Sequence, residues 1–355
     1  MEKFGFLAII LVWGGLIYFL LGSGPISAGL NGSNFLASAL SNINSNLKQQ
    51  EGAIGIVDNQ GNFQISKVHS NSTVSILDIE IFPNNPELIF AGSNRGLFIS
   101  KDNGLNWYDF SDIEHKITSD TQVYKILFNP AKKTEGFVSV FSGNKGAIYR
   151  SQDNFFSLDK LIDFTSEGVY DFDINNNNLY LGLSNGRLLL YSLGKNETRV
   201  LTTFGSAIKQ IRVFQNGGLI YLTLKSGGFW VSRDGGESFE RMKFLDDYRG
   251  ANSINYFEPS IVNNSLIYAA TNYGLIRSLD SGDSWRVLKS LPSEEQSVSA
   301  VGFNDKTGGI FTASNGRIYK SLDNGSNWQI IDTGFSGGEI SILKLIGDKI
   351  IIASK

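Results

Sequence analysis

The chain of 355 residues contains no cysteine, which excludes disulfides, thiol nucleophiles and thiolate metal sites. Its two histidines, His69 and His115, stand on separate segments, so neither a histidine metal centre nor a Ser-His-Asp triad is expected. Charged residues make up only 18% of the chain, and the net charge is −3. Nucleic-acid-binding proteins carry clustered Lys and Arg residues, which this charge balance does not indicate, so no nucleic-acid partner is expected.

What the chain does contain is a repeated phrase, S-x-D-x-G-x-x-W, preceded each time by apolar strand-like segments and Gly/Asn turns. Four copies are clear and a fifth is degenerate: SKDNGLNW at Ser100–Trp107, SRDGGESF at Ser232–Phe239, SLDSGDSW at Ser278–Trp285, SLDNGSNW at Ser321–Trp328, and SQDNFFSL at Ser151–Leu158. A period of about 40–50 residues with flanking strands predicts an all-β propeller.

The number of blades follows from the strands between the repeated phrases. Six blades are predicted to begin near residues 74, 120, 167, 206, 250 and 296. Two strands remain at each end of the folded region, in 52–68 and in 339–354. We expect the C-terminal pair to form the inner half and the N-terminal pair the outer half of a seventh blade, since this pairing removes two open sheet edges. Residues 51–355 then form a seven-bladed β-propeller of roughly 44 residues per blade.

The repeated phrases resemble Asp-boxes, and nearly all of residues 51–355 resembles the Asp-box (BNR) propeller superfamily. Within it, one ring with a membrane anchor is most similar to the photosystem II assembly/stability factor group. Sortilin-type and xyloglucanase-type propellers carry the same phrase. The resemblance implies the fold, whereas unrelated activities share the Asp-box, so it implies little about function.

The aspartates of the repeats are predicted to be structural. Each carboxylate can accept hydrogen bonds within its own turn, the glycine can adopt a left-handed conformation, and the aromatic residue can cover the gap between blades. Catalysis or calcium binding is not favoured, because one acid per blade spreads the carboxylates around the ring. The residues assigned to these turns are Asp102, Asp153, Asp234, Asp280, Asp323, Trp107, Phe239, Trp285 and Trp328.

The N-terminus carries the one long apolar run. Residues 4–21 contain no charged side chain, and as a helix they would reach about 27 Å, so residues 1–22 are predicted to be a transmembrane anchor. Lys3 ahead of this run places the propeller on the extracytoplasmic side of the cell membrane. Cleavage as a signal peptide after Ala28, giving a secreted protein, is the alternative. Residues 23–50 are predicted to be a linker with a short helix in 34–50.

The sequence favours a non-catalytic protein-binding scaffold over an enzyme. No F/Y-R-x-P phrase of the sialidase type is present, and xyloglucanase-type enzymes cut between two rings whereas these repeats form one. A carbohydrate-active propeller, as a glycoside hydrolase or a glycan binder, stays the alternative, and facing carboxylates would favour hydrolysis. No cofactor and no metal is expected.

Recognition is expected on one face of the ring, where inner-strand side chains and loops lie on a rigid scaffold. Aromatic and basic side chains favour protein contacts, although inner-strand residues can also simply fill the channel. Membrane or envelope proteins are the expected partners, with a role in their assembly or quality control, while the oligomeric state stays open. The candidate partner-binding residues are Tyr124, Lys125, Lys209, Arg212, Tyr256 and Glu258.

Overall fold

The computed structural model describes residues 10–13, 16–19, 53–57, 63–68, 74–214, 217–288, 296–331, 339–346 and 349–354. These residues belong to two compact units, Met1–Ser45 and Asn46–Lys355.

The described residues of the first unit form a small antiparallel sheet, in which β1 (Ile10–Trp13) pairs with β2 (Leu16–Phe19). The predicted transmembrane helix is not seen at these positions, and no described helix has the length and apolarity needed to cross a membrane. Apolarity alone does not distinguish a helix from a strand, and Gly14-Gly15 in this run is a sequence typical of hairpin turns. The rest of 4–21, and the helix predicted in 34–50, lie outside the described residues.

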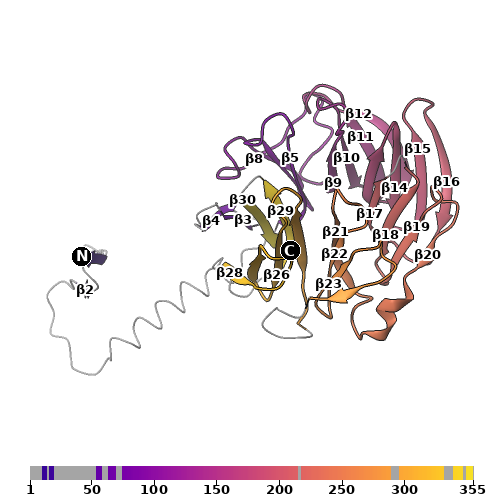
Figure 1. Cartoon of the computed structure of the whole chain (residues 1–355). Coiled ribbons are helices and arrows are strands. Elements are labelled where there is room, and N and C mark those ends of the chain that lie inside the picture. Colours follow the sequence, from indigo (N-terminus) through magenta and orange to yellow (C-terminus); the bar gives the residue numbers. More distant parts are fainter. Residues whose placement is uncertain are drawn as a thin grey trace. The chain divides into compact units, whose positions relative to one another are not determined.

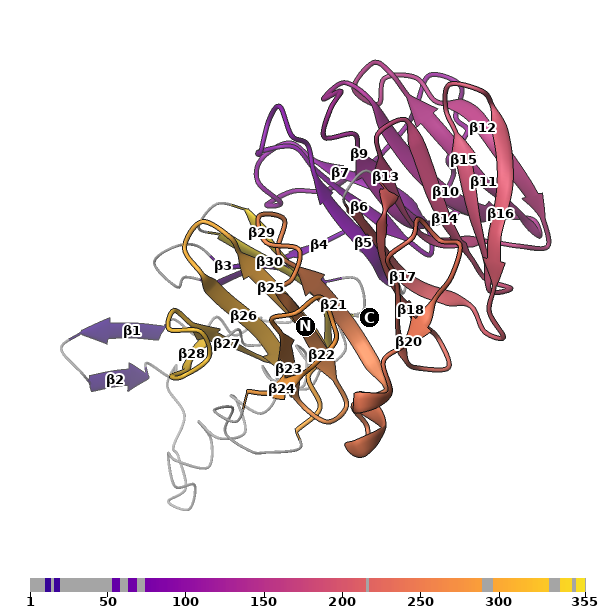
Figure 2. The same ribbon diagram turned by 45° about the vertical axis from the view of Figure 1, so that its right-hand side comes forward.

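The second unit is an all-β propeller of seven four-stranded sheets (Figures 1 and 2). Blades 1 and 2 consist of β5 (Ile76–Ile81), β6 (Ile89–Ser93), β7 (Gly96–Ser100) and β8 (Tyr108–Asp109), then β9 (Gln122–Phe128), β10 (Gly136–Ser142), β11 (Lys145–Ser151) and β12 (Asp159–Thr165). Blades 3 and 4 consist of β13 (Val169–Asn175), β14 (Asn178–Leu183), β15 (Arg187–Ser192) and β16 (Glu197–Thr203), then β17 (Ile208–Phe214), β18 (Leu219–Leu224), β19 (Phe229–Ser232) and β20 (Glu240–Arg241). Blades 5 and 6 consist of β21 (Ile254–Pro259), β22 (Ile267–Thr271), β23 (Leu275–Ser278) and β24 (Arg286–Val287), then β25 (Ala300–Asn304), β26 (Gly309–Ser314), β27 (Arg317–Ser321) and β28 (Gln329–Ile331).

The seventh blade joins the two ends of the propeller and confirms the predicted closure. Its strand order is β29 (Ile340–Ile346), β30 (Lys349–Ser354), β3 (Ala53–Val57) and β4 (Phe63–Lys67). The joint is the antiparallel pairing of β3 with β30, in which Ile54 lies opposite Ala353. Gly55 permits the close approach here, because a Cβ at this position would lie 2.6 Å from the Phe63 ring and 2.9 Å from Ile352.

Seven apolar clusters of buried residues hold neighbouring blades together, one at each blade boundary. The boundary between blades 4 and 5, for example, packs Phe229 edge-on against Phe257 and Trp285. Strand alternation explains this arrangement, because each blade presents an apolar row to both of its neighbours. The core is therefore divided among seven interfaces between neighbouring blades.

The five repeated turns share one hydrogen-bonding pattern, which blade 5 illustrates. The Ser278 hydroxyl donates to Asp280 Oδ1 at 2.9 Å and accepts the Gly282 N–H at 2.9 Å. Asp280 Oδ1 also accepts the Ser284 N–H at 2.8 Å, while the Trp285 ring N–H donates to the Gly282 carbonyl. The same aspartate contacts occur at Asp102, Asp153, Asp234 and Asp323. Each aspartate is thus engaged within its own turn.

The degenerate copy in blade 2 keeps this turn without the glycine. Phe155 occupies the glycine position with φ of 68°, a left-handed conformation that is costly for a bulky residue. Its N–H still donates to the Ser151 hydroxyl, and Ser157 N–H donates to Asp153 Oδ1. The Phe155 ring is buried against Phe90 and Phe128, and this packing offsets the backbone strain.

Replacing Ser278 with alanine should lower the free energy of unfolding by about 1–3 kcal/mol, because the buried Gly282 N–H loses its acceptor. Leu279→Ala in the same turn is the control, since Leu279 is 60% exposed and should change stability by less than about 0.5 kcal/mol. Urea unfolding measures both variants. Equal effects of the two substitutions would contradict a structural role for the serine.

Candidate functional site

Six of the seven inner strands carry a β-bulge close to their first residue. In β13, for example, Val169 lies opposite Leu183 and Asp171 opposite Gly182, which leaves Tyr170 without a partner. A bulge redirects the extra side chain, and bulges are common beside binding sites. The bulge residues are Leu77, Tyr124, Tyr170, Lys209, Asn255 and Ser341.

All six bulge residues line one cavity of about 530 Å³ at the start of the inner strands. We call this opening, defined by the six bulge residues and Lys225, the channel mouth. Tyr124 and Tyr170 meet edge-to-face with ring centroids 5.0 Å apart, and the Lys225 ammonium lies 5.2 Å from the centre of the Tyr170 ring. The aliphatic side chains of Leu77 and Ile342 also line the cavity. The mouth therefore combines aromatic, aliphatic and basic side chains.

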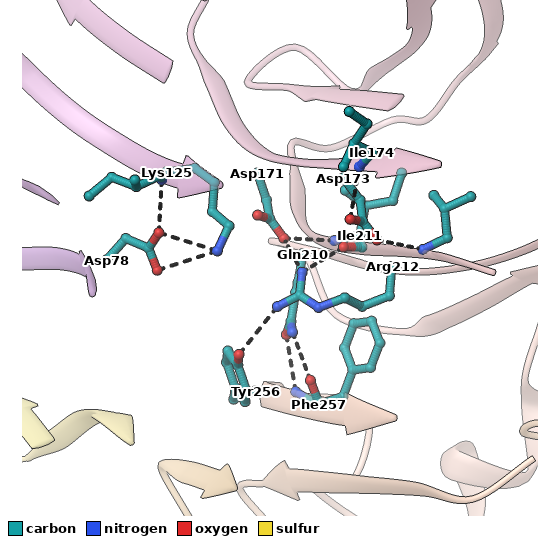
Figure 3. A network of polar contacts seen from close by, with 12 residues as sticks. Asp78, Lys125, Asp171, Asp173, Ile174, Gln210, Ile211, Arg212, Tyr256 and Phe257 are labelled. Carbon is teal, nitrogen blue, oxygen red and sulfur yellow. Dashed lines mark hydrogen bonds and ion pairs between the residues drawn. The ribbon is translucent and has the colours of Figure 1, made fainter. Parts of the chain in front are cut away.

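Polar side chains directly after the bulges connect neighbouring blades (Figure 3). Asp78 Oδ2 in blade 1 accepts the Ile126 N–H of blade 2 at 2.9 Å, and Asp171 Oδ2 in blade 3 accepts the Ile211 N–H of blade 4 at 2.9 Å. The Gln210 amide makes two bonds with the backbone of Phe257 in blade 5. These bonds hold neighbouring inner strands together, and the bulge residues of these strands line the channel mouth.

Asp78 also forms an ion pair with Lys125, whose Nζ lies 3.2 Å from Asp78 Oδ2. Both side chains are largely buried, with 8% and 10% of the Lys125 and Asp78 side chains exposed. Burial alone would lower the pKa of Lys125, but the carboxylates of Asp78, Asp171 and Glu80 outweigh it and hold this pKa above its ordinary value. Lys125 is therefore charged, and its charge depends on Asp78.

Arg212 connects two other residues of the cavity lining, Asp171 and Tyr256 (Figure 3). Its guanidinium lies 3.0 Å from Asp171 Oδ2 and donates to the Tyr256 hydroxyl at 3.2 Å. Burial raises the pKa of Tyr256, so this hydroxyl keeps its proton at neutral pH. Arg212 in blade 4 therefore links Asp171 in blade 3 to Tyr256 in blade 5.

Asp173 lies two residues beyond Asp171, on the same face of β13. Its two carboxylate oxygens accept the N–H groups of Ile174 and Val213, each at 2.8 Å. Burial raises the pKa of Asp173 to about 6 against the opposing effect of Arg212. A carboxylic acid with such a pKa suits proton transfer, but here both oxygens bind backbone and Asp173 is not among the residues that line the cavity.

The structure brings five of the six predicted partner-binding residues together at this cavity: Tyr124, Lys125, Lys209, Arg212 and Tyr256. Glu258 does not line it and instead lies two residues after Tyr256 in β21, where it helps to raise the pKa of Arg212 and Lys344. Sequence reasoning missed the carboxylates Asp78 and Asp171, together with the other cavity residues Tyr170, Lys225 and Lys344. Asp78 and Asp171 each directly follow a bulge residue, and a bulge is defined by strand pairing, so apolar periodicity carries no signal for them.

No member of the repeated-turn set lines the cavity. Trp107, Trp285 and Trp328 donate their ring N–H groups to carbonyls of their own turns, and Trp107 also bonds to Ser66 in blade 7. Phe239 packs against Phe204 at the boundary of blades 3 and 4. Among the described residues, no group of His, Cys, Asp and Glu side chains could hold a metal ion.

Comparisons with known proteins give matches in structure only. No protein-family model and no curated protein sequence matches the chain. YCF48 from Cyanidioschyzon merolae superposes with a TM-score of 0.60 at 15% identity, covering 81% of this chain and 98% of the YCF48 chain. The two chains therefore share a β-propeller fold. YCF48 bound to D1 peptide gives 0.61 at 12% identity, covering 85% of this chain and 97% of its own.

An ancestral GH74 enzyme is similar as well, with a TM-score of 0.57 at 15% identity over 80% of this chain. This chain spans only 45% of the GH74 chain, whereas it spans nearly all of the YCF48 chains. At these identities the likeness establishes the fold alone.

Replacing Asp78 with alanine should lower the free energy of unfolding by about 3–5 kcal/mol, because the Lys125 ammonium stays buried without its nearest partner. The double variant Asp78→Ala/Lys125→Met should recover the part of this loss that the unpaired ammonium causes. It should stay about 1–3 kcal/mol less stable than the wild type, because the buried Ile126 N–H still lacks its acceptor. Urea unfolding of both variants measures the difference. A double variant as unstable as the single one would show that the ion pair is not the cause.

Asp173 should make stability depend on pH. Its pKa is about 6 in the folded protein, whereas that of an unfolded aspartate is near 3.9. Protonation of Asp173 therefore stabilises the folded state fully below about pH 4, and this stabilisation is lost as the pH rises to about 6. The variant Asp173→Asn should therefore gain stability relative to the wild type by up to about 1.4 kcal/mol per pH unit over this window. Urea titrations between pH 4 and 7 test this, and a pH-independent difference would contradict the raised pKa.

Proposed function

We propose that this propeller is a non-catalytic module that binds a segment of a membrane or envelope protein at the channel mouth. In this role it would take part in the assembly or quality control of such proteins. The bound segment is acidic and carries apolar residues, for the reasons that follow.

The charge and character of the cavity lining carry this proposal. Five basic side chains but only two carboxylates line it, and both carboxylates, Asp78 and Asp171, are already in ion pairs. Lys344 forms a third ion pair, with Glu80, so five basic groups and three carboxylates leave a net charge of +2, which favours an acidic segment. Tyrosine and arginine are among the residues that contribute most to protein-protein binding energy. At this cavity, the Tyr124–Tyr170 pair and Leu77 provide an apolar surface that a partner can contact.

The same geometry gives little support to hydrolysis. A glycosidase needs one free carboxylic acid and one free carboxylate on either side of the scissile bond. Asp78 and Asp171 are each held by a cation and a backbone N–H, and both oxygens of Asp173 bind backbone. None of these three acids is available for proton transfer in this arrangement.

YCF48 bound to D1 peptide offers a precedent for peptide binding by a propeller of this fold. We extend it to this chain only as peptide binding, without the identity of the peptide. The cavity of about 530 Å³ is in the range of ordinary ligand pockets, which suits a few side chains of an extended segment.

Membrane anchoring forms part of the proposal and rests on the sequence. Residues 4–21 are uncharged and long enough to span a bilayer, and Lys3 ahead of them favours an extracytoplasmic propeller. The partner would then be an integral or peripheral protein of the same membrane. Cleavage after Ala28 would instead release the propeller as a secreted protein.

A carbohydrate-active propeller is the second candidate. The Tyr124–Tyr170 pair favours it, since aromatic faces at a cavity rim can stack on sugar rings, and an ancestral GH74 enzyme shares the fold. In this case the mouth would hold a glycan, and binding would depend on the tyrosines more than on the lysines.

A photo-crosslinking amino acid in place of Tyr124, introduced into the full chain in its own cells, tests the proposal. It should give a discrete crosslinked protein, and Lys209→Glu/Lys225→Glu should reduce the yield by about tenfold because two attractive charges at the mouth become repulsive. Mass spectrometry identifies the crosslinked protein.

The matched control is Lys101→Glu/Lys306→Glu, which makes the same charge change at exposed sites at the opposite ends of the strands. It should leave the crosslink unchanged. Equal losses for both double variants would contradict binding at the mouth. A glycan array that retains the wild type, and loses it with Tyr124→Ala but not with the lysine variant, would favour the carbohydrate candidate.

A further inference from the structure

Exposed apolar side chains gather at the ends of the strands opposite the channel mouth. The inner strands begin at the mouth, so the turns that follow the inner strands and the third strands of the blades lie at the other end. Ten large apolar side chains of the described residues are half exposed or more, and six of them occupy such turns: Leu105, Phe156, Ile261, Val262, Leu279 and Leu322. The other four lie on outer strands or in the β8–β9 loop.

The β21–β22 loop carries the two most exposed of these side chains. Ile261 and Val262 are adjacent in sequence and are 77% and 79% exposed. The whole loop, residues 260–266 with the sequence SIVNNSL, contains no charged side chain. Burial of two neighbouring aliphatic side chains in an apolar medium would be favourable, and no charge in the loop opposes it.

Hydrogen bonds hold the tip of this loop in place. The Ser260 hydroxyl accepts the N–H groups of Val262 at 3.2 Å and of Asn263 at 2.8 Å. Asp305 in blade 6 accepts the Ile261 N–H at 3.0 Å and also the Ser260 hydroxyl proton. All three N–H groups of 261–263 are therefore bonded within the protein. An apolar medium requires this, because it offers no partner to a backbone donor.

Two leucines extend the apolar surface over blades 5 and 6. Leu279 and Leu322 directly follow the serine of the repeated turn in these blades and are 60% and 61% exposed. Blades 1 and 4 have the charged residues Lys101 and Arg233 at this position. A Cβ at Gly309 would lie 3.3 Å from Leu322 Cδ2, so Leu322 packs against the same turn of blade 6 that holds the β21–β22 loop.

The chemistry of this surface favours a lipid bilayer over a protein partner. Exposed aliphatic side chains on turns are suited to the interface of a bilayer, where the acyl chains can cover them. The tip offers a protein partner no N–H group that is not already bonded. Asp280 and Asp323 in the neighbouring repeated turns are acidic, so the attraction must come from apolar burial and not from anionic head groups.

We propose that the turns of blades 5 and 6 insert Ile261 and Val262 into the interface of a membrane, with Leu279 and Leu322 beside them. The channel mouth lies at the other ends of the strands, so it would point away from the bilayer and receive a segment that projects from it. The anchor in the proposed function would keep the propeller near the bilayer, whereas the insertion is a property of these turns alone.

The absence of cysteine from the chain permits a test with a single fluorescent label. The full chain is reconstituted into phosphatidylcholine vesicles with a dye on Val262→Cys, and a spin-labelled phosphatidylcholine serves as the quencher. Quenching should be at least about fivefold stronger than for the same dye on Val200→Cys. Val200 is the matched control, because it is the same residue type, is 52% exposed and lies on the outer strand of blade 3.

A charge at the tip should abolish the insertion. With the dye on Leu279→Cys, the variant Ile261→Asp should reduce quenching by about tenfold, because a carboxylate opposes entry into the bilayer. Ile113→Asp is its control, since Ile113 is 61% exposed in the β8–β9 loop, and it should leave quenching unchanged. Both variants should keep the wild-type circular dichroism and the crosslink from Tyr124, which separates this proposal from binding at the mouth.

Equal quenching of the dyes at Val262→Cys and Val200→Cys would overturn the proposal. Quenching that appears only after phosphatidylglycerol is added would also contradict it, because the attraction would then be to anionic head groups. A photo-crosslinking amino acid at Val262 that captures one discrete protein in cells, together with an unquenched dye at the same position, would assign the surface to a protein partner instead.

Discussion

The pairing of β3 with β30 is the constraint on which the rest of this propeller depends. It joins the first and the last described strands of the ring in one sheet, and it brings β29 beside β5 as the last of seven blade boundaries. Without it, the clusters on both sides of blade 7 would lose the residues that β3 contributes, Ile54 and Ile56 on one side and Val57 on the other. Because the bulge residues come from six blades, the cavity also exists only while the ring is closed.

Much of the fold could be predicted from the sequence, because its signals are local and repeated. The turns around Asp102, Asp280 and Asp323 set the period, and alternating strands between them gave the blade count and the closing pair. The degenerate copy at Ser151 also forms the same turn. The apolar run at 4–21 was harder, since its apolarity fits a strand as well as a helix, and its described residues form strands.

The site was predictable in part, for a different physical reason. Inner-strand residues such as Tyr124 and Arg212 were identified because basic and aromatic side chains there must face the channel or a neighbouring blade. Asp171 and Lys344 were missed, because the bulges that bring side chains to the mouth arise from pairing with the next strand. A bulge shifts the alternation by one residue, so it cannot be read from apolar periodicity alone. Ion pairs between blades, such as Asp78 with Lys125, likewise depend on three-dimensional proximity.

Hydrogen exchange of the folded chain, read by mass spectrometry, tests ring closure most directly. If β3 and β30 share one sheet, amides in 53–57 and 349–354 should be protected to the same degree and should exchange together with the strands of blades 1 and 6. Fast exchange of 53–57 while 349–354 stays protected would mean that the N-terminal strands are not part of the ring, and it would contradict the account.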